Sequence, residues 1–178
     1  MCGLSGSGKS TTANQLVKLA SAIRLRSDAV RKHLAGIGLH EKGSDEIYTA
    51  AMTNKTYTRL IDLGVQLAAR GYRVILDAKF DRQAKRTEAI AKAAAQDLPL
   101  TFLHCTAPPE VLKARVEQRC GDIADATATI LAKQSMEPFD PTDPVVVVDT
   151  TKPIAEIQQQ LCRVFDSLLE WDQGQKKS

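Results

Sequence analysis

The sequence has no apolar run close to the length that crosses a bilayer. A transmembrane helix needs about 20 consecutive apolar residues, and none of the apolar runs in these 178 residues comes near that length. No positively charged and then apolar leader precedes the first motif either. We therefore expect a cytoplasmic protein without a membrane span.

Long blocks of like charge are also scarce. The formal net charge is +3, and acidic and basic residues alternate along most of the chain. Proteins that bind nucleic acid through its phosphates carry a basic face. The composition therefore does not favour a nucleic acid as partner.

Cysteines are few, and their spacing indicates neither disulfides nor a metal site. Cys2, Cys105, Cys120 and Cys162 form no C-x-x-C pair and no metal-binding spacing with the three histidines. We expect free thiols in a reducing compartment.

What the sequence does have is a phosphate-binding loop at its amino end. Residues 3–10 read Gly-Leu-Ser-Gly-Ser-Gly-Lys-Ser, which fits the pattern G-x-x-x-x-G-K-[ST]. Backbone N–H groups of such a loop converge on phosphate oxygens, while Lys9 reaches the β- and γ-phosphates and the Ser10 hydroxyl binds Mg²⁺. A base-reading Asn-Lys-x-Asp is lacking, which argues against a GTPase. The residues expected to bind nucleotide are Gly3, Leu4, Ser5, Gly6, Ser7, Gly8, Lys9, Ser10 and Thr11.

Apolar runs alternate with helical patterns along the chain, which predicts an α/β fold with a parallel sheet. We expect one domain over 1–178, with a disordered tail over 172–178. The strands are expected over 22–27, 72–77, 100–105 and 145–149. Helices are expected over 9–22, 28–35, 44–70 (as one helix or two) and 81–96. Further helices are expected directly after Pro108, over 126–136 and from Pro153 on. The last of these has an apolar stripe that starts at Ile154.

No strand is visible before the loop, because only Met1 and Cys2 precede it. A phosphate-binding loop normally joins a buried strand to a helix. The recorded start can be too late, the sheet can tolerate a two-residue stub, or the piece can be cut from a longer polypeptide. We favour the first explanation and expect the first strand to be largely missing and the chain to be poorly stable.

Two acidic residues follow predicted strands. Asp77 would orient the Mg²⁺ waters beside the loop, unless it only caps the next turn. Asp28 would accept the proton of an acceptor hydroxyl, with Arg31 one helical turn later binding the acceptor or the transferred phosphoryl group. The alternative makes Asp28 a helix cap and Arg31 its surface ion-pair partner.

Two arginine pairs are candidates for binding anions. Arg115 and Arg119, spaced i, i+4, would supply positive charge to the polyphosphate from a lid, or they lie on a solvated helix face. Arg82 and Arg86 would hold an anionic substrate, or they lie on the surface.

Four segments together carry a resemblance to a known family. They are Gly-Leu-Ser-Gly-Ser-Gly-Lys-Ser-Thr, Leu-Arg-Ser-Asp-Ala-Val-Arg, Val-Ile-Leu-Asp-Ala and Ala-Arg-Val-Glu-Gln-Arg. In these the chain resembles, from residue 3 to about 150, the AAA-type small kinases of the P-loop superfamily, relatives of polynucleotide, zeta-toxin, gluconate and shikimate kinases.

The resemblance implies a three-layer nucleotide-kinase fold with a parallel sheet of order 2-3-1-4-5, and ATP–Mg²⁺ as donor. It implies a base at Asp28, a partner arginine at Arg31, a metal-side carboxylate at Asp77 and lid arginines at Arg115 and Arg119. Lys79 departs from the family, whose members usually have Thr or Asn there.

We therefore expect an ATP-dependent kinase that phosphorylates a hydroxyl of a small-molecule acceptor. One alternative is an ATP-binding regulatory module with weak ATPase activity, partnering an aminoglycoside-phosphotransferase-like domain. Another is a 5′-hydroxyl nucleic-acid kinase.

Overall fold

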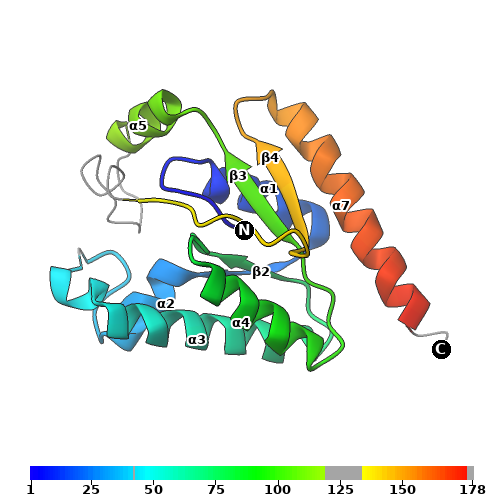
Figure 1. Ribbon diagram of the computed structural model, residues 1–178, viewed down its shortest axis with the longest axis horizontal. Helices are drawn as coiled ribbons and strands as arrows, with labels where there is room; N and C mark the ends of the chain where they lie inside the picture. The colour runs from blue at the N-terminus through cyan, green and yellow to red at the C-terminus, as the bar shows by residue number, and fades with distance from the viewer. Residues whose placement is uncertain (42, 119–133, 176–178) are drawn as a thin grey trace.

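The computed structural model describes residues 1–41, 43–118 and 134–175. Its helices lie on both faces of parallel strands, in an α/β fold of three layers (Figure 1). The strands are β1 (Ile23–Arg26), β2 (Val74–Asp77), β3 (Phe102–Thr106) and β4 (Val145–Asp149). The helices are α1 (Lys9–Ala20), α2 (Ser27–Leu34), the 3-10 helix η1 (Asp45–Tyr48), α3 (Ala50–Ala68), α4 (Gln83–Ala94), α5 (Pro109–Glu117) and α7 (Ile154–Gln175).

The strands form two parallel pairs. β1 pairs with β2, with Leu25 opposite Leu76, and β3 pairs with β4, with Cys105 opposite Val148. Because parallel strands end at the same edge of a sheet, the segments that follow them open to one side of the molecule. The phosphate-binding loop and the residues after β1, β2 and β4 therefore have the placement that a shared site requires.

The dipeptide Met1-Cys2 lies between the two pairs. The Met1 amino group donates to the Leu76 carbonyl of β2 (2.9 Å). Cys2 N–H donates to the Leu103 carbonyl of β3, and the Cys2 carbonyl accepts from Cys105 N–H, both at 2.9 Å. Two residues thus occupy the position of a strand in front of the loop. On the far side of Met1 from the loop, a cavity of about 510 Å³ opens between β2 and β3.

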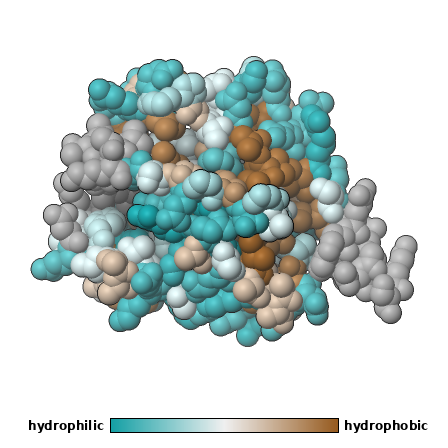
Figure 2. Space-filling model, viewed as in Figure 1, coloured by the Kyte–Doolittle hydropathy of each residue, from teal (hydrophilic) through white to brown (hydrophobic). Residues whose placement is uncertain are grey.

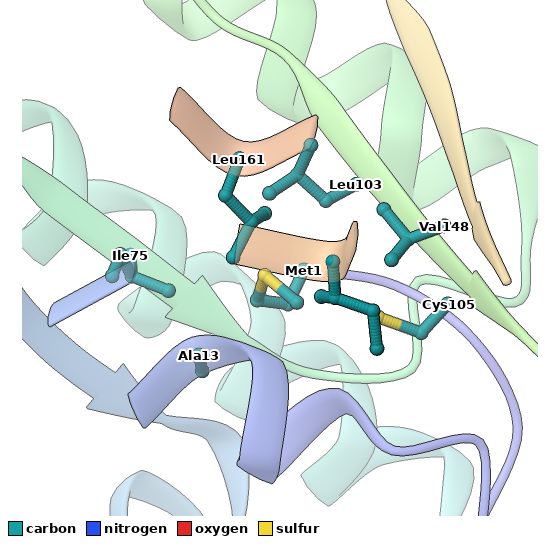
Figure 3. Close-up of a cluster of buried hydrophobic side chains, with 8 residues drawn as sticks. Met1, Ala13, Ile75, Leu103, Cys105, Val148 and Leu161 are labelled. Carbon is teal, nitrogen blue, oxygen red and sulfur yellow. The ribbon is translucent and has the colours of Figure 1, made fainter. Parts of the chain in front are cut away.

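The alternation of side chains along this dipeptide divides the core in two. Met1 packs with residues of α1, α7 and the sheet, among them Ala13 and Leu161 (Figure 3). Cys2 packs on the opposite face with residues of α3 and α4, among them Leu60 and Ala89. Burial raises the pKa of the Cys2 thiol to about 11.

The structure bears on three expectations for the helices. The segment predicted as one helix or two over 44–70 is η1 followed by α3, because Thr49 is extended (φ −62°, ψ 158°) and caps α3 by accepting from Met52 N–H. The helix predicted over 126–136 falls mostly outside the described residues, and residues 134–136 are not helical. Of the predicted stripe on α7, Ile157 and Leu161 are buried, but Ile154 is 46% exposed.

The surface seen in Figure 2 is hydrophilic over much of its area, with hydrophobic side chains gathered over β3 and β4 and below them, between α4 and α7. Val147 of β4 is 55% exposed. Among the helices of the described ranges, none combines the length and the apolar character needed to cross a membrane.

Candidate active site

The loop of residues 3–10 has the backbone conformation of a phosphate cradle. Gly6 and Gly8 lie at φ +79° and +82°, in the left-handed region that favours glycine. A Cβ at Gly6 would lie 2.4 Å from the Leu112 carbonyl oxygen, and one at Gly8 would lie 2.9 Å from the Thr150 Cβ. Side chains at these two positions would collide with α5 and with the segment after β4, which pack closely against the loop.

The lysine and the hydroxyls of the motif lie where the loop becomes a helix. Lys9 is the first residue of α1, and its ammonium group donates to the Leu4 carbonyl at 2.7 Å. Ser10 and Thr11 belong to the first turn of α1, whose N-terminal end attracts anions. The loop is fixed to the segment after β2, because Gly3 N–H donates to the Lys79 carbonyl (2.9 Å).

Asp28 lies in the first turn of α2, directly after β1. Burial raises the pKa of its carboxyl group above the ordinary value, while the positive charges of Arg31, Arg26 and Lys9 lower it and the charge of Asp77 raises it. The carboxylate is therefore within electrostatic reach of the loop lysine. The N-cap of α2 is Arg26, so Asp28 is not the helix cap of the alternative interpretation.

Arg31 is buried rather than on the surface, with 7% of its area exposed. Its guanidinium donates to the Ile47 carbonyl at 2.9 Å and to Thr53 Oγ1 at 3.2 Å, and it stacks over the Tyr48 ring at 5.0 Å. The Nε–H is buried without a partner among the residues that the structure describes. Arg31 thus holds α2 against η1 and α3 and keeps one donor unused.

Asp77 ends β2 and forms an ion pair with Arg24 of β1. Arg24 also donates to Asn14 Oδ1 of α1 at 2.7 Å. One carboxylate oxygen of Asp77 is thereby held, and the side chain is 6% exposed. The sequence analysis did not identify Arg24 as a site residue. The signal for it was an arginine between the apolar residues Ile23 and Leu25 of a strand.

Arg115 of α5 contacts the loop itself. Its guanidinium donates to Thr150 Oγ1 (2.8 Å), to the Thr150 carbonyl (2.9 Å) and, at 3.4 Å, to the Gly6 carbonyl. It therefore connects α5, the phosphate-binding loop and the segment after β4, and does not lie on a solvated helix face. Its predicted companion, Arg119, lies outside the described residues.

Arg82 and Arg86 do not form an anion-binding pair. Arg86 is fully buried, donates to the carbonyls of Phe80 (2.9 Å) and Glu137 (3.0 Å), and lies 3.5 Å from Asp143. Arg82 is exposed and pairs with Glu137 (2.8 Å). The prediction of an anionic substrate at these residues is wrong for Arg86, because its donors already face protein oxygens. The surface alternative holds for Arg82 alone.

Comparison with known proteins identifies the family. Residues 1–138, which include the loop, Asp28, Asp77 and Arg115, match the AAA domain. The chain belongs to the AAA domain family. A relative of this AAA domain is an uncharacterized protein of Mycobacterium tuberculosis, 31% identical over 134 residues, or 73% of the chain. The chain spans only about a quarter of that relative's length (27%).

Solved structures share the fold of this AAA domain. A sugar kinase from Janibacter superposes with a TM-score of 0.68 at 22% identity, covering 93% of this chain and 91% of that one. An APS kinase of Mycobacterium tuberculosis, solved with AMPPNP and APS, also gives 0.68, at 24% identity and with 95% and 94% covered. The P-loop kinase fold predicted from the sequence is confirmed.

A contact that no sequence motif indicates joins the phosphate-binding loop of the AAA domain to Gln134. Ser5 N–H donates to Gln134 Oε1, and Gln134 Nε2 donates to Ser5 Oγ, each at 3.0 Å. The two residues are 129 positions apart, so no local pattern could have paired them.

Proposed function

We propose that this AAA domain transfers the γ-phosphoryl group of ATP to a hydroxyl group of a small-molecule acceptor. The observation that carries the proposal is Asp28, a half-buried carboxylate with a raised pKa that is electrostatically coupled to the lysine of a phosphate-binding loop. A base within electrostatic reach of a phosphate-binding loop is what transfer to an alcohol requires and what simple nucleotide binding does not.

The residues of the phosphate-binding loop fit a nucleoside triphosphate with Mg²⁺. The glycines at positive φ leave the backbone open, and Lys9 at the start of α1 adds a positive charge. Ser10 and Asp77 would hold the metal ion, Asp77 through the carboxylate oxygen that does not face Arg24. Bound ATP–Mg²⁺ supplies the phosphoryl group and neutralises the charge that develops on it.

Asp28 would take the proton from the acceptor hydroxyl. A general base is most effective when its pKa is close to the working pH, and burial moves the pKa of Asp28 in that direction. The buried Arg31 keeps α2 in place, and its unused Nε–H is a donor for the acceptor or for the transferred group. Arg115 would keep the Gly6 turn of the cradle fixed from its position against Thr150.

The test measures transfer and binding separately. With γ-labelled ATP and a panel of sugars, sugar acids and other alcohols, we expect transfer to at least one acceptor. Asp28→Asn should abolish it, while calorimetry with Mg–ATP should give a Kd within a few-fold of the unsubstituted protein. Asp166→Asn, an exposed change on α7, is the matched control. Transfer by Asp28→Asn at the unsubstituted rate would rule out the assigned base.

A regulatory ATP-binding module is the second candidate, and one observation favours it. The match covers only 27% of the relative from Mycobacterium tuberculosis, so a similar domain occurs there as part of a larger protein. A module of this kind would show only slow ATP hydrolysis that no acceptor in the panel changes. The same labelled-ATP assay therefore separates the two candidates.

A further inference from the structure

Gln134 is hydrogen-bonded to the backbone of the phosphate-binding loop. Its carboxamide oxygen accepts from Ser5 N–H and its amide nitrogen donates to Ser5 Oγ, so the two groups form a closed pair of hydrogen bonds. Ser5 is the third residue of the phosphate-binding motif and is 7% exposed. In Figure 1 the segment that begins at residue 134, in yellow, runs beside this loop, in blue.

The segment 134–138 is anchored independently of Gln134. Glu137 N–H donates to the Asp81 carbonyl (2.9 Å), and the Glu137 carboxylate accepts from Gln83 N–H (2.6 Å) at the start of α4. Arg86 donates to the carbonyls of Glu137 and Pro138. The backbone of the segment is thus fixed to α4, and the side chain of Gln134 alone connects it to Ser5 among these contacts.

A carboxamide oxygen and a phosphate oxygen compete for the same kind of donor. One N–H makes one good hydrogen bond, and a backbone N–H in a loop of this type is a donor for phosphate. The phosphate is charged and hydrogen bonds with a charged partner are the stronger ones, so it displaces the neutral amide when it binds. The free energy of the displaced pair of hydrogen bonds is then lost from the affinity for the nucleotide.

We propose that Gln134 sets the nucleotide affinity of the cradle by competing with phosphate for Ser5 N–H. The inference rests on the proposed function, because it needs a loop that binds a nucleotide. Gln134 lies outside the phosphate-binding motif and would lower the affinity for the nucleotide. Nucleotide binding would then be linked to the segment 134–138, which is anchored on α4.

Calorimetric titration with Mg–ATP tests the inference with three variants. Gln134→Ala removes both hydrogen bonds, and Gln134→Asn keeps the amide but shortens its reach by one methylene. Both should lower the Kd about threefold to tenfold, which corresponds to the net contribution of one or two weak hydrogen bonds. Gln134→Glu keeps the reach and adds a charge that accepts more strongly and repels phosphate, so its Kd should rise.

Gln159→Ala, an exposed change on α7, should leave the Kd unchanged. A Kd for Gln134→Ala and Gln134→Asn equal to or higher than that of the unsubstituted protein, with thermal stability retained, would overturn the inference and leave the proposed function standing. Absence of heat with the unsubstituted protein and with every variant would instead overturn the proposed function, and the inference with it.

Discussion

Replacement of Arg86 by alanine should be among the most destabilising single changes in this domain. The side chain is fully buried, with Nε 3.5 Å from the buried carboxylate of Asp143 and the guanidinium 4.2 Å from the Phe139 ring. It also donates to the carbonyls of Phe80 and Glu137. Alanine would leave one buried charge and several buried acceptors without a donor.

Removal of one partner of a buried ion pair costs about 3–5 kcal/mol. Domains of this size have a free energy of unfolding of about 5–15 kcal/mol, so the change would remove at least about a fifth of it. Arg86→Lys keeps the charge but lacks the planar set of donors, so it should recover only part of the loss. Arg82→Ala, only four positions away but 65% exposed, should leave stability nearly unchanged.

Urea unfolding followed by circular dichroism measures these differences. The four proteins, including the unsubstituted one, should give similar slopes against urea and different midpoints. A midpoint for Arg86→Ala equal to that for Arg82→Ala would refute the reasoning, because it would mean that the buried network contributes no more than the exposed pair.

Three further predictions concern the site and the sheet. Asp28→Asn should raise the melting temperature at pH 7, because the raised pKa means that folding destabilises the charged carboxylate. The gain should disappear below the ordinary pKa of 3.8, where the carboxyl group is neutral in both the folded and the unfolded state. An equal gain in melting temperature at pH 3.5 would contradict this reasoning. Gly6→Ala should lower stability by about 1–3 kcal/mol through strain at positive φ and should weaken Mg–ATP binding in calorimetry, since its Cβ would meet the Leu112 carbonyl oxygen; unchanged binding would count against the cradle. Four apolar residues added before Met1 should raise the melting temperature by filling the cavity between β2 and β3. Each buried side chain contributes about 1.5–3 kcal/mol, against a cost of about 1–2 kcal/mol for ordering its backbone. A Gly-Ser extension of equal length is the control, and equal melting temperatures for the two extensions would show that the cavity does not accept a strand.

The order of strands and helices could be predicted because it is encoded locally. Periodicity and turn residues indicated β2 and β4 within two residues, and Pro109 marked the start of α5. Whether residues 44–70 form one helix or two stayed open, since Thr49, where η1 and α3 meet, has no glycine or proline beside it. The hydrogen bonds of Met1 and Cys2 to β2 and β3 could not be predicted, because they depend on strands that are distant in sequence.

The candidate site divides in the same way. The phosphate-binding loop could be recognised from sequence because backbone groups of eight consecutive residues make it, and their spacing specifies the conformation. The environment of a charged side chain could not be predicted from the sequence. Arg82 and Arg86 are one helical turn apart, yet the first is exposed and the second is fully buried.

Sequence by itself determined the phosphate-binding loop, the alternation of strands and helices and the position of Asp28 after a strand, since each depends on neighbours along the chain. Tertiary structure alone decided that Arg24 holds Asp77 and that Gln134 closes on Ser5. The physical reason is that burial and pairing depend on which surfaces the packed elements bring together. A contact between residues 129 positions apart leaves no periodicity or spacing by which a sequence could reveal it.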